Sequence, residues 1–187
     1  VKPLVRQIES GLDGVLILDD PIEEKAYSKE NDLISWHFDH SLKRSVKGVN
    51  QVTGMLYSAI HETSIPIGFE WVLKTQTVVD KKTGQAKRQS EETKNEHFRK
   101  IVQQAVKNNI QFKYVLADSW YGNQDNMRLI KETSKKDFVL GLKSNTYVCT
   151  KIVLGEKESY QALGSLSFEA GEVKAVFFKG LDFPVGI

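Results

Sequence analysis

Two aspartates each follow a short apolar stretch of the chain. Asp118 comes directly after residues 115–117 (Val-Leu-Ala), and Asp20 comes, with Asp19, after residues 15–18 (Val-Leu-Ile-Leu). Continuous apolar runs of this kind are typical of strands buried on both faces. A carboxylate at the carboxyl end of such a strand lies where an α/β sheet places its chemistry. A single such Asp is often only a turn former or helix cap, but two of them favour a shared functional site.

Two carboxylates that meet would offer hard oxygen ligands, which bind Mg²⁺ or its substitute Mn²⁺ rather than zinc. Two such ions, about 3.5–4 Å apart, can activate the attacking oxygen and stabilise the leaving oxygen of a phosphodiester. Asp19 and Asp20 are expected to point to opposite faces of their strand, so only one should be a ligand. We favour Asp20, at the very end of the strand, with Asp19 as the alternative.

The elements that must position these acids follow the order strand, two-strand meander, helix, strand, helix, strand. The clearest helix spans 93–109, because Thr93 and Glu96 have capping-box spacing and an apolar stripe follows them. The other expected elements are a helix at 3–10, strands at 15–19, 49–60, 65–77, 112–117 and 138–142, a helix at 123–136, a short helix around 31–37 and a mobile charged loop at 80–93.

This order predicts an α/β fold with a ribonuclease-H-like mixed sheet flanked by helices. Its first and fourth strands would be parallel neighbours in the middle of the sheet, joined by a permitted crossover. Residues 1–145 would form this core. Residues 146–187 are expected to be a β-rich insertion segment at the C-terminal end, because short β-like runs at 151–154, 165–168 and 173–179 alternate with Gly and polar turns.

Composition sets the limits of the functional prediction. The chain has 187 residues with 40% hydrophobic and 27% charged residues, enough for a substantial core. Its net charge is only +2, so any surface that binds nucleic acid must come from local clustering. The single cysteine, Cys149, fits a reducing compartment. No signal peptide or transmembrane run is expected.

Several side chains are candidates for contacts with a phosphate backbone. Lys43, Arg44 and Lys47 place three cations in the expected loop after the first acid, and Lys143 follows a strand end. Solvated loops often carry such charges as well. Trp36 and Trp120 could stack on bases, although core packing is the more common role of tryptophan.

Histidine spacing suggests a weaker candidate. His37 and His40, with Asp39 between them, have a spacing that a helix could use for metal binding. No Cys or third His lies nearby to complete a zinc site, so a structural or DNA-facing role is favoured.

The two acid segments, residues 15–20 and 116–122 (Leu-Ala-Asp-Ser-Trp-Tyr-Gly), resemble the DDE transposases of the IS4-like group of bacterial insertion sequences. The separation of 98 residues between Asp20 and Asp118 suits that group, as does the segment 138–145 with its basic end. The resemblance implies a cytoplasmic, nucleoid-associated nuclease and strand transferase that acts on DNA at transposon ends. It implies Asp20 and Asp118 as the first two metal-binding acids, Mg²⁺ as cofactor and a possible homodimer.

One departure from the family pattern concerns the third acid, a Glu in a Tyr-x2-Arg-x3-Glu-x6-Lys pattern. Neither Tyr147 nor Tyr160 has Arg three residues later, so no such Glu occurs here. Because the chain begins without Met and ends abruptly, we expect a fragment of a longer protein, inactive by itself. Two alternatives stay open: a non-catalytic DNA-binding or interaction module with the same sheet, and a related repair or junction nuclease.

Overall fold

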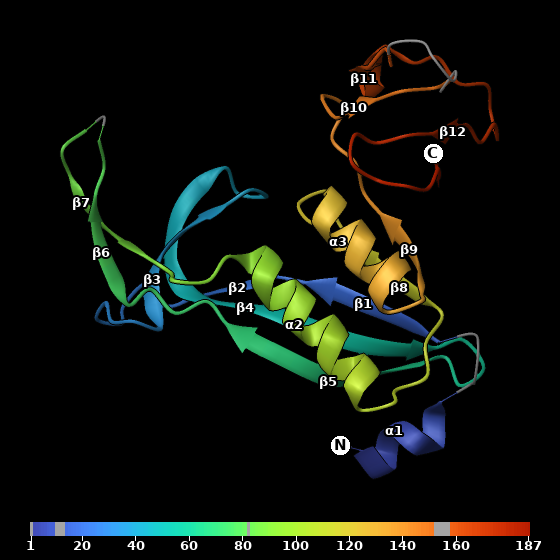
Figure 1. Cartoon of the computed structure of the whole chain (residues 1–187). Coiled ribbons are helices and arrows are strands. Elements are labelled where there is room, and N and C mark those ends of the chain that lie inside the picture. The colour runs from blue at the N-terminus through green and yellow to red at the C-terminus, as the bar shows by residue number, and fades with distance from the viewer. Residues whose placement is uncertain (1, 10–13, 82, 152–157) are drawn as a thin grey trace. The chain divides into compact units, whose positions relative to one another are not determined.

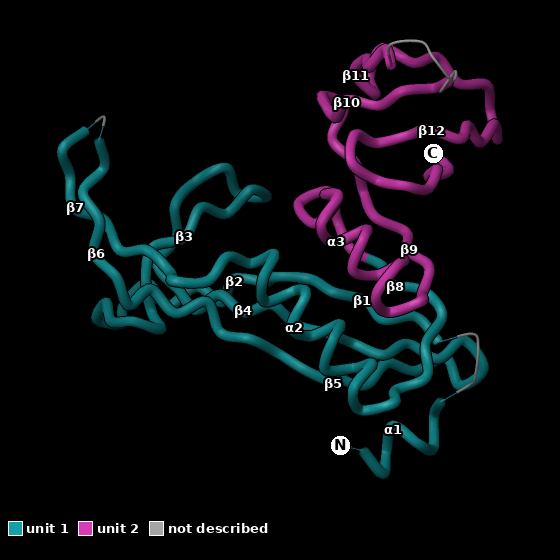
Figure 2. Tube along the Cα trace, in the orientation of Figure 1, with its two compact units in different colours: residues 1–116 teal, residues 117–187 magenta. Residues whose placement is uncertain are grey.

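The computed structural model describes residues 2–9, 14–81, 83–151 and 158–187. The chain divides into two compact units, residues 1–116 and residues 117–187 (Figure 2). The strand β8 crosses the division, because its last residue, Ala117, begins the second unit. Each unit is described by itself.

The described part of the first unit contains the helices α1 and α2 and most of the strands (Figure 1). In chain order its elements are α1 (Lys2–Ile8), β1 (Val15–Asp19), β2 (Ile22–Glu24), β3 (Ile34–Asp39), β4 (Arg44–Ser58), β5 (Thr63–Trp71), β6 (Gln76–Val79), β7 (Ala86–Gln89), α2 (Lys94–Lys107) and β8 (Tyr114–Ala117).

The long strand β4 is the centre of this unit. Its first half pairs with β2 and β3, and its second half pairs with β1 and β5, in every case antiparallel. On the other side of β1 lies β8. The Lys113 N–H donates to the Gly14 carbonyl at 2.8 Å, so β1 and β8 begin at the same edge and run in the same direction.

The core of the first unit lies between this sheet and α2. One stripe of α2, which includes Phe98, Ile101 and Val102, is buried. The sheet contributes a facing apolar surface, made of Leu16, Leu18, Val52 and Leu56. A Cβ on Gly54 would lie 2.6 Å from Ile101 Cγ2, so glycine is needed for the helix to pack this closely on β4.

The second unit begins with Ala117 and continues through α3 (Gln124–Arg128), the π-helical turn η2 (Leu129–Thr133) and β9 (Asp137–Leu140). β9 lies next to β8, and the Gly141 N–H donates to the Ala117 carbonyl at 3.0 Å. Short pairs follow: β10 (Tyr147–Val148) with β11 (Gln161–Ala162), then the 3-10 turn η3 (Leu163–Ser165), then β12 (Ala175–Val176) with β13 (Val185–Gly186). The elements of the second unit share a hydrophobic core, which includes the buried side chains of Met127, Val148 and Phe178.

The predicted α/β fold is confirmed. Seven strands form one mixed sheet, and the order β5-β4-β1-β8-β9 within it is the predicted ribonuclease-H-like arrangement. The boundary between residues 145 and 146 remains a prediction. No helix among the described residues is long and apolar enough to span a membrane.

Three local predictions were wrong. A short helix was expected around 31–37, but these residues lead into the strand β3, which pairs with β4. The charged loop expected at 80–93 contains β7, which pairs with β6 as a hairpin. No strand forms at 165–168, and most of the expected strand at 151–154 lies outside the described residues.

Candidate functional site

The first acid of the predicted site lies where β1 ends. Leu16 and Leu18 face α2, and the alternation of the strand places Asp20 on that same face. The Asp20 carboxylate pairs through Oδ2 with the ammonium of Lys94, the first residue of α2. The side chains of Asp20 and Lys94 are only 16% and 23% exposed, so the pair is largely shielded from solvent.

Asp19 has different surroundings. It lies on the opposite face of β1, is exposed, and its Oδ1 accepts a hydrogen bond from the Asp20 N–H at 2.9 Å. The choice of Asp20 over Asp19 as the ligand remains a prediction.

Buried polar side chains continue the Asp20 face of the sheet. Asn50 on β4 is completely buried, and its Nδ2 donates to the Asp20 carbonyl at 3.1 Å. Asn50 Oδ1 has no hydrogen-bond partner among the described residues. On β3, the Ser35 hydroxyl and His37 Nε2 share a buried hydrogen bond of 3.1 Å. This face therefore changes from apolar under α2 to polar next to Asp20.

Two lysines give this polar region its electrostatic character. Burial, together with the nearby ammonium groups of Lys74 and Lys94, lowers the pKa of His37 to about 4. Burial and the charge of Lys94 also lower the pKa of Lys74, although Glu30 acts in the opposite direction. His37 is therefore a neutral imidazole at neutral pH, next to two cations that repel each other.

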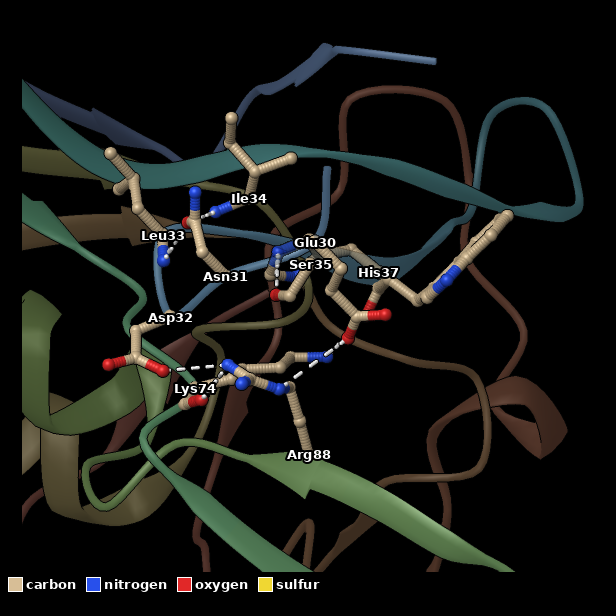
Figure 3. A network of polar contacts seen from close by, with 10 residues as sticks. Glu30, Asn31, Asp32, Leu33, Ile34, Ser35, His37, Lys74 and Arg88 are labelled. Atoms are coloured by element: carbon tan, nitrogen blue, oxygen red, sulfur yellow. Dashed lines mark hydrogen bonds and ion pairs between the residues drawn. The ribbon is translucent and has the colours of Figure 1, made fainter. Parts of the chain in front are cut away.

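Arg88 connects the β6–β7 hairpin to the segment before β3 (Figure 3). Its guanidinium donates to Asp32 Oδ1 at 2.7 Å and to the Lys74 carbonyl at 3.3 Å, and lies 3.8 Å from Glu30. Lys74 in turn donates to the Trp36 carbonyl on the edge of β3. A cavity of about 500 Å³ lies beside this network, lined by Trp36, Lys74, Lys87 and Arg88 among others.

Sequence reasoning did not identify His37, Asn50, Lys74 and Lys94 as neighbours of the first acid. Lys94 follows Thr93, so its place in the first turn of a helix was predictable from the capping box. Its pairing with Asp20, 74 residues earlier, has no signal in the local sequence.

The second acid opens a tight turn after β8. Asp118 Oδ1 accepts a hydrogen bond from the Trp120 N–H at 2.9 Å, and the Asp118 carbonyl accepts from the Tyr121 N–H at 3.2 Å. Tyr121 is completely buried and fixes the turn to the core, whereas Asp118 itself is exposed. Asn123 then caps α3 by accepting from the Asn126 N–H at 3.0 Å.

The loop after β9 supports this turn through close backbone contacts. A Cβ on Gly122 would lie 2.1 Å from the Gly141 carbonyl oxygen, and a Cβ on Gly141 would lie 2.7 Å from the Ser119 nitrogen. Glycine at both positions lets the two loops touch. Lys143 follows in the same loop, and its Nζ lies 4.8 Å from the centre of the exposed Trp120 ring. The second unit thus brings together Asp118, Trp120 and Lys143.

The other predicted cations lie in the first unit. Lys43 lies in the turn before β4 with a left-handed backbone, φ 51°. Arg44 and Lys47 were expected in a loop, but both lie on β4 because the strand begins earlier than predicted. Arg44 is paired with Glu24 at 3.0 Å, which reduces its availability to a phosphate. A role of these residues in DNA binding remains a prediction.

Two further expectations are corrected. Trp36 and Trp120 do not belong to the core, since they are 53% and 42% exposed. His37 lies on a strand and bonds Ser35, while the His40 ring lies edge-on to Phe38, with centres 5.0 Å apart. The helical metal spacing of this pair therefore does not form.

The donor groups fit a hard divalent cation in kind, since Asp20 and Asp118 supply carboxylate oxygens at strand ends. The set is incomplete, however. Among the described residues no group of three His, Cys, Asp or Glu side chains could hold a metal ion. A metal bound by Asp20 would also have to replace Lys94 at Oδ2.

Comparison with known proteins gives one family. No curated protein matches the chain. Among solved structures, the Drosophila P element transposase strand transfer complex is similar with a TM-score of 0.34 and 9% identity, over 83% of this chain and 35% of that one. The sequence pattern of a family described as DDE superfamily endonuclease matches residues 3–163, which is most of the chain. This protein therefore belongs to the DDE superfamily endonucleases.

Proposed function

We propose that this chain is part of the catalytic domain of a DNA transposase of the IS4-like group, which hydrolyses phosphodiesters and transfers strands at transposon ends. The observation that carries the proposal is the sheet order. β1 and β8 are neighbouring strands that run in the same direction, and Asp20 and Asp118 follow their last residues. Membership in the endonuclease family supports the same chemistry.

In this proposal Asp20 and Asp118 hold Mg²⁺, or Mn²⁺ in its place. DDE superfamily endonucleases generally use divalent metal ions. When bound, the metal supplies Lewis-acid activation of the attacking water or DNA 3′-hydroxyl and stabilises the leaving oxygen. Lys143 binds the phosphate backbone near Asp118, and Lys43, Arg44 and Lys47 bind it elsewhere on the first unit. The protein would act on DNA in the bacterial cytoplasm, as a homodimer that pairs two transposon ends.

The sequence contains no Glu in the family's third-acid pattern. We therefore propose that this chain alone does not cleave DNA, because two carboxylates do not complete the metal site. A second function, a non-catalytic DNA-binding module, is favoured by one observation: Lys94 already neutralises Asp20. The two functions differ in whether the acids bind metal.

Calorimetric titration with Mn²⁺ separates them. We expect weak binding by the wild type that is lost in both Asp20→Asn and Asp118→Asn. Asp125→Asn is the matched control, because this side chain is 73% exposed and pairs only loosely, at 3.5 Å, with Arg128. Mn²⁺ binding that survives Asp118→Asn would contradict the transposase proposal, and absence of binding by the wild type would favour the non-catalytic module.

A further inference from the structure

The ion pair between Asp20 and Lys94 is held from two separate elements. Asp20 is fixed at the end of β1, where Asn50 binds its carbonyl. Lys94 is fixed at the start of α2, directly after the N-cap Thr93. Because both ends of the pair are anchored and largely shielded, the contact belongs to the fold and is not an incidental surface contact.

The surroundings of Lys94 bring a second ammonium group close to it. Lys94 and Lys74 are close enough to act on each other and on His37, whose neutral ring provides no compensation. Asp20 compensates one of the two ammonium groups, and Glu30 partly compensates Lys74. If a divalent cation bound Asp20, Lys94 would lose its partner and the repulsion would increase. An anion would then be the natural partner of both lysines.

We propose that Lys94 is an exchangeable counter-ion of Asp20: it holds the carboxylate in the metal-free protein, and binds a backbone phosphate of DNA together with Lys74 once a divalent cation occupies Asp20. This inference rests on the proposed function, since it takes Asp20 as a metal ligand. Lys94 is a positioning residue in the metal-free protein and a substrate-binding residue in the loaded one.

The proposed exchange predicts that one substitution, Lys94→Met, strengthens metal binding and weakens DNA binding. In Lys94→Met the metal no longer competes with an ammonium for Asp20, so Mn²⁺ should bind on the order of tenfold more tightly. The same variant has lost one phosphate contact, so in the presence of Ca²⁺ it should bind DNA more weakly and with a salt slope smaller by about one. Simple damage to the fold would weaken both interactions, which distinguishes the two explanations.

The experiment combines calorimetry with Mn²⁺ and fluorescence anisotropy of a labelled DNA duplex, with and without Ca²⁺. Lys100→Met is the matched control, because it removes the same charge from the same helix and breaks a pair with Glu92 instead. Lys94→Arg is a second variant that keeps the charge and should retain metal affinity close to that of the wild type. We expect the Lys94→Met effect on DNA affinity to appear only when Ca²⁺ is present.

The outcomes separate this inference from the proposed function. If the wild type binds Mn²⁺ and Lys94→Met leaves the affinity unchanged or weakens it, the exchange is wrong while the metal site stands. If Lys94→Met tightens Mn²⁺ binding without any loss of DNA affinity, the phosphate role of Lys94 is wrong. If the wild type binds no Mn²⁺, both the exchange and the metal site are refuted.

Discussion

The capping box of α2 offers a sharp test of how the first unit is held together. Thr93 Oγ1 accepts from the Glu96 N–H at 3.2 Å, and Glu96 Oε2 accepts from the Thr93 N–H at 2.6 Å. Thr93→Ala removes the side-chain acceptor and leaves the Glu96 N–H with only its bond to the residue 93 carbonyl, at 3.0 Å. Such a substitution costs about 1 kcal/mol of the free energy of unfolding. For a chain of this length, that is a fall in Tm of about 2–4 °C.

Urea denaturation followed by far-ultraviolet circular dichroism measures this loss, because α2 is by far the longest described helix. Thr93→Ser is the control, since it keeps the accepting oxygen at the same position. We expect Thr93→Ala to lower the urea midpoint without changing the slope, and Thr93→Ser to stay close to the wild type. An unchanged midpoint in Thr93→Ala would refute the assignment of the cap.

The same variant also predicts a dependence on pH. Hydrogen bonds from the Thr93 backbone and side chain lower the pKa of Glu96 in the folded protein. Stability from the ionised Glu96 is therefore present above its unfolded pKa and is lost as pH falls through its folded pKa. The difference in stability between the wild type and Thr93→Ala should shrink in acid. A difference that stays constant through this range would show that Glu96 takes no part.

Two further predictions concern the two acids' surroundings. The pKa of His37 is about 4 in the folded protein and 6.5 in the unfolded chain, so the unfolded chain binds more protons and stability should fall by up to about 3 kcal/mol as pH drops across this interval. His37→Gln should remove that part of the pH dependence, and an NMR titration of His37 with a midpoint near 6.5 would contradict the prediction. Gly141→Ala places a Cβ 2.7 Å from the Ser119 nitrogen and should destabilise the second unit by about 1–3 kcal/mol in thermal unfolding. Gly68→Ala, whose Cβ would have no neighbour closer than 3.6 Å, is the control, and equal stability of the two variants would disprove the close contact.

The elements that sequence reasoning predicted well are those with a strong local signal. The apolar run at the start of β1 predicted the bounds of that strand correctly. The apolar stripe and the capping residues predicted the helix α2. β3 was missed because it is an edge strand of mixed polarity, with His37 and Ser35 inward and Trp36 exposed. The β6–β7 hairpin was missed for a related reason: β7 is exposed at every position, so no apolar alternation marks it.

The site was harder to predict than the fold. Each acid was visible as a carboxylate that follows an apolar run, because that pattern is local. The contacts around the first acid and in the nearby Arg88 network are not local: Lys94 reaches Asp20 across 74 residues, and Arg88 reaches Asp32 across 56. Such contacts depend on where α2 starts above the sheet and on the path of the β6–β7 hairpin, and neither is encoded in spacing alone.

The start of α2 determines both the stability and the chemistry of the Asp20 region. Along one face of β4, Val52 and Leu56 lie in the apolar core, whereas Asn50 lies beside Asp20. The helix begins near this change of polarity, at the Thr93 N-cap. Its first turn then supplies the positive end of the helix dipole and the Lys94 ammonium. Both favour negative charge at the end of β1. The same geometry that completes the core therefore makes this position suited to a carboxylate, and it is the basis of the exchange of Asp20 for a phosphate that we propose for Lys94.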